Sequence, residues 1–203
     1  MRIVFATGNE GKLKEIREIM GDLNLEIVSM KEAGIKADIV EDGTTFVENA
    51  LIKARTISKI AKGELVMADD SGLVIDALNG EPGIYSARYM GEDTPYSVKN
   101  AAILERLKDV KGAERSARFV CAVASVITDE DGNAKEYTIE RTFEGLIAEE
   151  TAGSNGFGYD PIFFVPERGV TSAELTSEEK NALSHRGKAL RAMKEILREN
   201  LPG

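Results

Sequence analysis

The chain has 203 residues, of which 42% are hydrophobic, so it can bury a core in one large domain or in two small lobes. Acidic residues number 35 against 26 basic ones, and the formal net charge of -9 repels polyanions such as duplex DNA and anionic membrane surfaces. These values disfavour a nucleic-acid partner and a membrane partner. A small anionic ligand is compatible with them, because a bound cation can reverse the field locally.

The chain contains one cysteine, Cys121, and one histidine, His185. These counts exclude intrachain disulfides and a zinc site built from clustered Cys and His ligands, which leaves oxygen ligands and a hard cation such as Mg²⁺. A lone thiol suits a reducing compartment. The apolar run at residues 3–6 is too short for a signal peptide or a membrane span, so we expect a cytoplasmic protein.

The N-terminal part of the sequence predicts a strand, a glycine-rich turn and a helix. Residues 3–6 form a short apolar run, and apolar residues then recur at helical spacing between 13 and 20. A second helix is predicted from Thr45, which forms a capping-box pair with Glu48 ahead of an apolar face that extends to Ala61.

The middle of the chain predicts strands separated by turns, followed by a third helix. Residues 65–68 look like a buried strand that ends in the turn Asp69-Asp70-Ser71-Gly72, before a new apolar stretch at 73–78. Thr94-Pro95 has the order expected of an N-cap and a first helical residue. The side chains expected to face inward from this helix are Val98, Ala102 and Leu107.

A central strand and a hairpin are predicted next. Residues 119–127 are nearly all apolar, as in a strand covered on both faces, and Asp131-Gly132 turns the chain back into the looser alternation of 137–143. Residues 153–160 combine glycines with aromatic residues, which is typical of a loop whose backbone a ligand can approach closely.

The C-terminal part predicts two helical segments. Thr176 and Glu179 cap the first, and Gly187 interrupts the pattern just after His185-Arg186. The apolar face of the last helix comes from Leu190, Met193, Ile196 and Leu197.

Residues 7–12, the turn between the first strand and helix, are candidates for binding phosphate. Backbone N–H groups and the positive end of a helix meet there, and Thr7, Asn9 and Lys12 add donors. The turn is not a Walker A loop, because only two residues separate its glycines and a leucine follows the lysine. An ordinary strand-to-helix turn is the competing interpretation.

The acidic pairs Asp69-Asp70 and Glu41-Asp42 are candidates for binding a cation. Two adjacent carboxylates at the end of a buried strand are costly unless a cation or hydrogen bonds compensate them. Two or three carboxylates together with substrate phosphates are the usual ligands of Mg²⁺. Alternatively, Asp70 and Ser71 cap a turn and Glu41-Asp42 is solvated, and from the residues alone both interpretations stay open. The capping box already explains Glu48.

Five residues in the C-terminal part of the sequence could have either a functional or a structural role. Lys180, His185 and Arg186 could line one side of a cleft near a helix break, although terminal-helix cations are usually solvated and a solitary histidine is usually structural. Phe157 and Tyr159 could stack on a base or fill the core.

Taken together, these segments resemble the inosine/xanthosine triphosphate pyrophosphatase family, whose members hydrolyse deaminated purine nucleoside triphosphates such as ITP, dITP and XTP. The resemblance covers nearly the whole chain and rests on six stretches in the right order. They are FATGNEGK at 5–12, TFVENA at 45–50, ADDSGL at 68–73, PGIYSARY at 82–89, GFGYDPIF at 156–163 and EKNALSHR at 179–186.

The resemblance implies roles for individual residues. Glu41 and Asp70 would bind Mg²⁺, and Asp70 would also activate the attacking water. Residues 7–12 would hold the triphosphate, residues 157–160 would pack against and read the purine, and the pair His185-Arg186 would donate hydrogen bonds toward its 6-oxo group. The full set expected to contact substrate is Thr7, Gly8, Asn9, Glu10, Gly11, Lys12, Ser71, Phe157, Gly158, Tyr159, Asp160, Lys180, His185 and Arg186.

The resemblance also implies an α/β fold, with an elongated mixed β-sheet flanked by helices. Residues 1–203 would form a single domain of two lobes with a central substrate cleft, and the protein would be a homodimer. The expected reaction is attack of water on the α-phosphorus, which yields a nucleoside monophosphate and pyrophosphate. Alternatives are a pyrophosphatase for other modified nucleoside triphosphates and a nucleotide-binding module without catalysis.

Overall fold

The computed structural model describes residues 2–23, 25–128 and 131–200, which form two compact units. The first unit comprises Met1–Asp70, Cys121–Arg141 and Arg186–Gly203, and the second comprises Ser71–Val120 and Thr142–His185. Within the described ranges, no helix is both long and apolar enough to cross a bilayer.

The described strands form a mixed sheet in the order β2-β1-β3-β4-β5-β6-β7. Their bounds are β1 Arg2–Phe5, β2 Glu26–Ser29, β3 Leu65–Ile75, β4 Ser116–Thr128, β5 Ala134–Ile147, β6 Phe163–Val165 and β7 Val170–Thr171. β1 runs parallel to both β2 and β3, whereas β6 runs antiparallel to β5 and β7. The predicted α/β fold with a mixed sheet and flanking helices is therefore confirmed.

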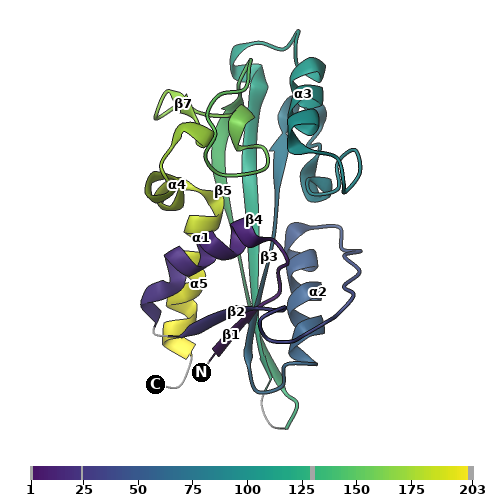
Figure 1. Ribbon diagram of the computed structural model, residues 1–203, viewed down its shortest axis with the longest axis vertical. Coiled ribbons are helices and arrows are strands. Elements are labelled where there is room, and N and C mark those ends of the chain that lie inside the picture. The colour runs from purple at the N-terminus through teal and green to yellow at the C-terminus, as the bar shows by residue number, and fades with distance from the viewer. Residues whose placement is uncertain (1, 24, 129–130, 201–203) are drawn as a thin grey trace. The chain divides into compact units, whose positions relative to one another are not determined.

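In the first unit, helices cover both faces of the sheet. α1 (Glu10–Met20) and α5 (His185–Asn200) lie on one side of the strands and α2 (Phe46–Ser58) lies on the other (Figure 1). Because strand side chains alternate between faces, Phe5 and Met67 pack under α1 and α5, whereas Val4, Val66 and Ala124 pack under α2. This double coverage explains the nearly continuous apolar runs of the central strands.

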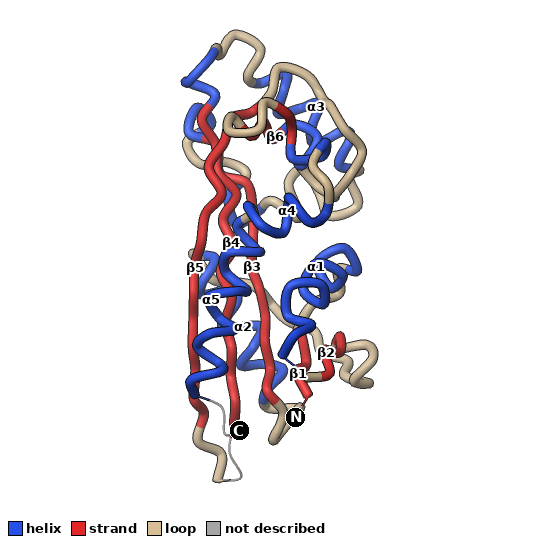
Figure 2. Tube along the Cα trace, turned by 90° about the vertical axis from the view of Figure 1, so that its left-hand side faces the viewer, coloured by secondary structure: helices blue, strands red, loops and turns tan. Residues whose placement is uncertain are grey.

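The second unit contains α3 (Tyr96–Arg106), β6 and α4 (Ser177–Leu183), which are labelled in Figure 2. Its core includes Leu73, Ile103, Phe119, Phe143 and Phe163. Short 3-10 turns occur across the chain at Gly21–Leu23, Asp76–Leu78, Gly83–Tyr85, Gly112–Arg115, Asp160–Ile162 and Ser172–Glu174.

The structure confirms most of the predicted elements and corrects one strand. The predicted turn at residues 69–72 is wrong, because β3 continues through them to Ile75. Two buried carboxylates are compatible with a strand here because Lys12, Lys53 and Arg186, from three different helices, form ion pairs with them.

The predicted start of α3 is also wrong. The helix begins at Tyr96, and the hydroxyl of Thr94 donates to the carbonyl of Met90 instead of capping it. Val98, predicted to face inward, is 46% exposed, and the side chains that point inward are those of Lys99, Asn100 and Ile103. Each helical residue turns the face by about 100°, so a small error in register moves a different set of side chains inward.

The helix break near the C-terminus lies earlier than predicted. The backbone is extended at Ser184, and Gly187 lies inside α5. A glycine costs a helix interior only about 1 kcal/mol relative to alanine, which the packing of α5 against the sheet overcomes. The capping box of Thr176 and Glu179 is confirmed. At α2, Thr45 caps the helix as predicted, but the Glu48 carboxylate accepts hydrogen bonds from Thr44.

Candidate active site

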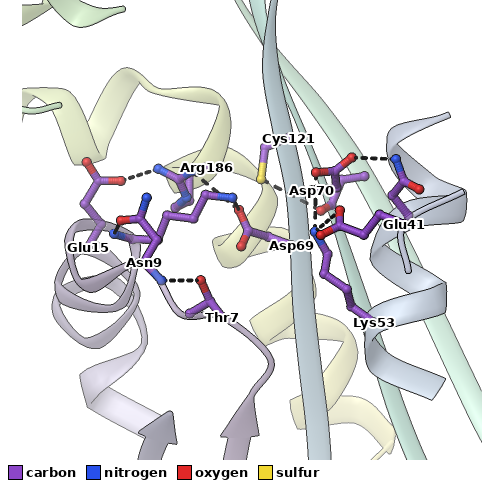
Figure 3. A network of polar contacts seen from close by, with 12 residues as sticks. Thr7, Asn9, Glu15, Glu41, Lys53, Asp69, Asp70, Cys121 and Arg186 are labelled. Atoms are coloured by element: carbon purple, nitrogen blue, oxygen red, sulfur yellow. Dashed lines mark hydrogen bonds and ion pairs between the residues drawn. The ribbon is translucent and has the colours of Figure 1, made fainter. Parts of the chain in front are cut away.

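The turn before α1 is fixed by its own side chains. The hydroxyl of Thr7 accepts a hydrogen bond from the Asn9 N–H, and the side chain of Asn9 accepts one from the Lys12 N–H, both at 3.1 Å (Figure 3). Asn9 is thus the N-cap of α1, and the remaining N–H groups of the first turn have no acceptor within the helix.

The same turn is open to ligands. It borders a cavity of about 730 Å³, whose lining also includes Lys31 and Glu32. Gly8, Asn9 and Glu10 line this cavity and are exposed, so their backbone groups are accessible to an anion.

Asp69 gathers two cations inside the first unit. Its Oδ2 lies 3.0 Å from Lys12 Nζ and 3.4 Å from Arg186 Nη2, and Arg186 also pairs with Glu15. The side chain of Asp69 is 1% exposed. Burial opposes its ionisation, but Lys12 and Arg186 hold the pKa of Asp69 below its ordinary value. The predicted residues Lys12 and Arg186, far apart in the sequence, are therefore brought together on one carboxylate.

Asp70 points to the other side of β3, toward α2 (Figure 3). Its Oδ1 lies 3.4 Å from Lys53 Nζ, which is also 2.8 Å from an oxygen of Glu41. Its Oδ2 accepts a hydrogen bond of 3.3 Å from Asn49. Burial, above all, raises the pKa of Asp70 above its ordinary value. The cations Lys53 and Lys12 oppose this shift, and the negative charges of Glu41 and Asp69 add to it. The two adjacent acids thus have separate surroundings.

Lys53 and Asn49 were not among the residues predicted from the sequence to belong to the site. Both are buried, and they lie four residues apart on α2, so they face the same direction. The available signal was their position: they interrupt a helix face that is otherwise apolar, which includes Ala50 and Ala54. Polar residues on a buried face need partners, and these partners are Asp70 and the segment that carries Glu41.

The carboxylates of Glu41 and Asp70 fit a hard cation. Within the described residues no group of three or more His, Cys, Asp or Glu side chains could hold a metal ion. Mg²⁺, however, is usually bound through one or two carboxylates, with water and substrate phosphates as its other ligands. The two acids share the Lys53 ammonium, so this part of the unit already accommodates positive charge between them.

In the second unit, Asp160 organises the predicted purine-binding loop. Its carboxylate accepts hydrogen bonds from the Phe157 N–H at 2.9 Å, from the Ser172 hydroxyl at 2.9 Å and from Lys180 Nζ at 2.6 Å. Lys180 Nζ also lies 4.8 Å from the centre of the Phe157 ring. Lys180 thus holds Asp160, and Asp160 holds the backbone of the loop at Phe157.

Three further predicted residues belong to this unit. Tyr159 is buried in the core and donates its hydroxyl to the Ser86 carbonyl at 2.7 Å, so it supports the loop from beneath. The Gly158 carbonyl accepts a hydrogen bond from Asn100. Ser71 is half-buried in β3, directly after Asp70.

His185 is also buried in the second unit, and its ring stacks on Phe119 with the ring centres 4.9 Å apart. Its neighbour Arg186 belongs to the first unit, where Glu15 and Asp69 hold it. The predicted site residues therefore form two clusters, one in each unit.

The fold and these clusters define a mixed α/β protein in which cations from several helices surround two buried carboxylates. The model of the Ham1 family matches residues 3–196, and the chain belongs to this family. The resemblance seen in the sequence is thereby confirmed.

Relatives of this family match over nearly their whole length. The dITP/XTP pyrophosphatase of Clostridium perfringens is 52% identical over an alignment that covers 100% of this chain and 98% of the relative. The dITP/XTP pyrophosphatase of Escherichia coli K12 is 46% identical, with 97% and 98% covered. The solved HAM1 protein of Coxiella burnetii has a TM-score of 0.85 at 42% identity, covering 98% of this chain and 99% of that one.

Proposed function

We propose that this protein is a hydrolase that converts the non-standard purine nucleoside triphosphates ITP, dITP and XTP to the monophosphate and pyrophosphate, and so clears deaminated purines from the nucleotide pool. The observation that carries the proposal is the buried carboxylate of Asp70 beside Glu41 and Lys53, in a chain that the Ham1 family model matches over residues 3–196. The names of the two relatives described above support the substrate class.

The turn of residues 7–12 would bind the triphosphate. Its exposed backbone groups and the N-terminus of α1 favour an anion, and the Lys12 ammonium, on the first turn of the same helix, would bind phosphate oxygens. Lys12 already pairs with Asp69, which keeps its side chain ordered for this contact.

Mg²⁺ would be held by Glu41 and Asp70, and when bound it would neutralise charge on the phosphate oxygens. Asp70 would orient a water molecule toward the α-phosphorus and accept its proton. A bond forms between the water oxygen and phosphorus while the bond to the bridging oxygen breaks, and pyrophosphate leaves.

Base recognition would use the loop at residues 157–160 and the pair His185-Arg186. Phe157 and the loop held by Asp160 and Lys180 would pack against the purine. His185 and Arg186 would donate hydrogen bonds to the 6-oxo group, which accepts them, whereas the 6-amino group of adenine would leave buried donors unpaired. On this account we propose that residues 1–203 act as one functional domain.

The test is a pyrophosphate-release assay with ITP, XTP, GTP and ATP, each with and without Mg²⁺. We expect release from ITP and XTP that needs the metal. Asp70→Asn should remove most turnover, whereas Asp76→Asn, an exposed acid that binds Ser116 and Arg118, serves as the matched control. Normal turnover by well-folded Asp70→Asn protein would disprove the role of Asp70.

The same assay separates the alternatives. Release from modified pyrimidine triphosphates but not from ITP would identify a different pyrophosphatase, and binding of ITP without release would identify a binding module. We also propose that the protein is a cytoplasmic homodimer, which analytical ultracentrifugation and fractionation of cells test directly.

A further inference from the structure

We propose that Asn49 is a positioning residue, which orients the Asp70 carboxylate and ties it to the segment that carries Glu41. This inference rests on the proposed function, because it assigns Asn49 a part in the same hydrolytic site. Asn49 itself would contact neither substrate nor metal.

The amide of Asn49 bridges two parts of the first unit. Its Oδ1 accepts a hydrogen bond from the Gly43 N–H at 2.9 Å, and its Nδ2 donates to Asp70 Oδ2 at 3.3 Å. The orientation of the amide is fixed by chemistry, because the Gly43 N–H can only donate and must face the amide oxygen. The NH₂ group therefore faces Asp70. Asn49 is 1% exposed, so water does not compete for these bonds.

Lys53 makes the parallel connection one turn later on α2. It pairs with Asp70 Oδ1 and with Glu41, so each oxygen of the Asp70 carboxylate has one partner on this helix. Asn49 and Lys53 therefore link the same two elements, the segment of Glu41–Gly43 and strand β3. Lys53 makes this connection through ion pairs. Asn49 makes it through hydrogen bonds of a neutral amide, which adds no charge to the site.

The packing at Gly43 shows how closely this segment is fitted to Asn49. A Cβ atom at Gly43 would lie 2.7 Å from Asn49 Oδ1 and 2.8 Å from the Cβ of Glu48, both too close for any side chain. Glu48 in turn accepts hydrogen bonds from the N–H and hydroxyl of Thr44. The segment is thus held against the first turn of α2 on both sides of Gly43.

A loosened Asp70 would affect chemistry more than substrate binding. The phosphate and purine contacts come from other residues, so the KM for ITP should change little when Asn49 is altered. The orientation of the carboxylate toward water and metal should suffer, since small misplacements of a reacting group cost about 100-fold in rate, and loss of a partner behind a metal ligand costs about 10–100-fold in metal affinity or activity.

The experiment compares the full-length wild-type protein with Asn49→Ala, Asn49→Asp and the control Ala54→Gly. Ala54 is buried on the same helix among apolar residues and has no polar side-chain atom, so its replacement weakens α2 without removing a polar group of the amide link. Asn49→Asp keeps an acceptor for Gly43, but it replaces the donor to Asp70 by a carboxylate and so places a second negative charge beside Asp70. If Asn49→Ala does not fold, the kcat and KM of Asn49→Asp provide the test.

We expect both Asn49 variants to lower kcat for ITP about 10–100-fold with KM within about twofold of the wild type. We also expect Asn49→Ala to bind Mn²⁺ about 10-fold more weakly in calorimetric titrations without turnover, in the presence of an α,β-methylene analogue of ITP. Ala54→Gly should change neither value. If wild-type protein hydrolyses ITP and the Asn49 variants behave like Ala54→Gly, the inference is wrong. If the wild type itself does not hydrolyse ITP, the proposed function has failed instead.

Discussion

Replacing Lys180 by Met tests whether this lysine stabilises the folded protein or only contacts the substrate. The side chains of Lys180 and Asp160 are 7% and 4% exposed and lie 2.6 Å apart. Breaking a buried ion pair by removing one partner costs about 3–5 kcal/mol, because the remaining charge stays buried. Asp160 keeps its bonds to Ser172 and to the Phe157 N–H, so we expect the lower end, about 3 kcal/mol.

The assay is urea unfolding followed by circular dichroism, together with the KM for ITP. The loop that includes Phe157 loses an anchor in Lys180→Met, so KM should rise about 10-fold, which corresponds to about 1.4 kcal/mol of binding. The double variant with Asp160→Asn removes both charges, and we expect it to recover about 2 kcal/mol of the lost stability. A Lys180→Met protein as stable as the wild type, but with a raised KM, would refute this reasoning and leave Lys180 as a substrate contact alone.

Four further outcomes are expected. Arg186→Ala should reduce the preference for ITP over ATP, measured as the ratio of kcat/KM values; an unchanged ratio contradicts its role at the base. Arg115→Met should lower the free energy of unfolding by about 3–5 kcal/mol in urea, because the buried guanidinium donates to four backbone carbonyls. Burial raises the pKa of the Cys121 thiol to about 12, so a disulfide reagent at pH 8 should label it only in unfolded protein. Hydrogen bonds from Arg17, above all, lower the pKa of Glu32 to about 2, which is below its value in the unfolded chain. The ionised Glu32 therefore stabilises the fold fully above about pH 4.3, and this stabilisation is lost as the pH falls toward 2. The difference in urea midpoint between wild type and Glu32→Gln should therefore shrink over that range.

Local patterns were sufficient to predict most of the elements. The apolar run before Thr7, the Thr45 cap and the capping box at Thr176 each depend on residues a few positions apart, and each has the expected counterpart in the structure. The mixed sheet and the family were also foreseen, the latter from six short stretches acting together.

The errors arose where residues distant in the sequence decide the outcome. Residues 69–72 looked like a turn because a polar run that ends in glycine separates two apolar stretches. The cations that pair with Asp69 and Asp70 come from positions 12, 53 and 186, and no local pattern connects those positions. In the same way, Lys99 rather than Val98 is buried because its ammonium reaches the Ala87 carbonyl and lies over the Tyr96 ring.

The same pair of acids shows why a motif does not assign one role to both members. Adjacent strand residues point to opposite faces, so Asp69 and Asp70 meet different partners although they are neighbours in the chain. Asp69 is surrounded by Lys12 and Arg186, which lower its pKa and suit it to hold those two cations in place. Asp70 shares its main cation, Lys53, with Glu41, so the two carboxylates carry more negative charge than Lys53 alone can neutralise. In the proposed mechanism Asp69 would place the cations and Asp70 would serve the chemistry, and the alternation of a single β-strand would give the two acids these separate roles.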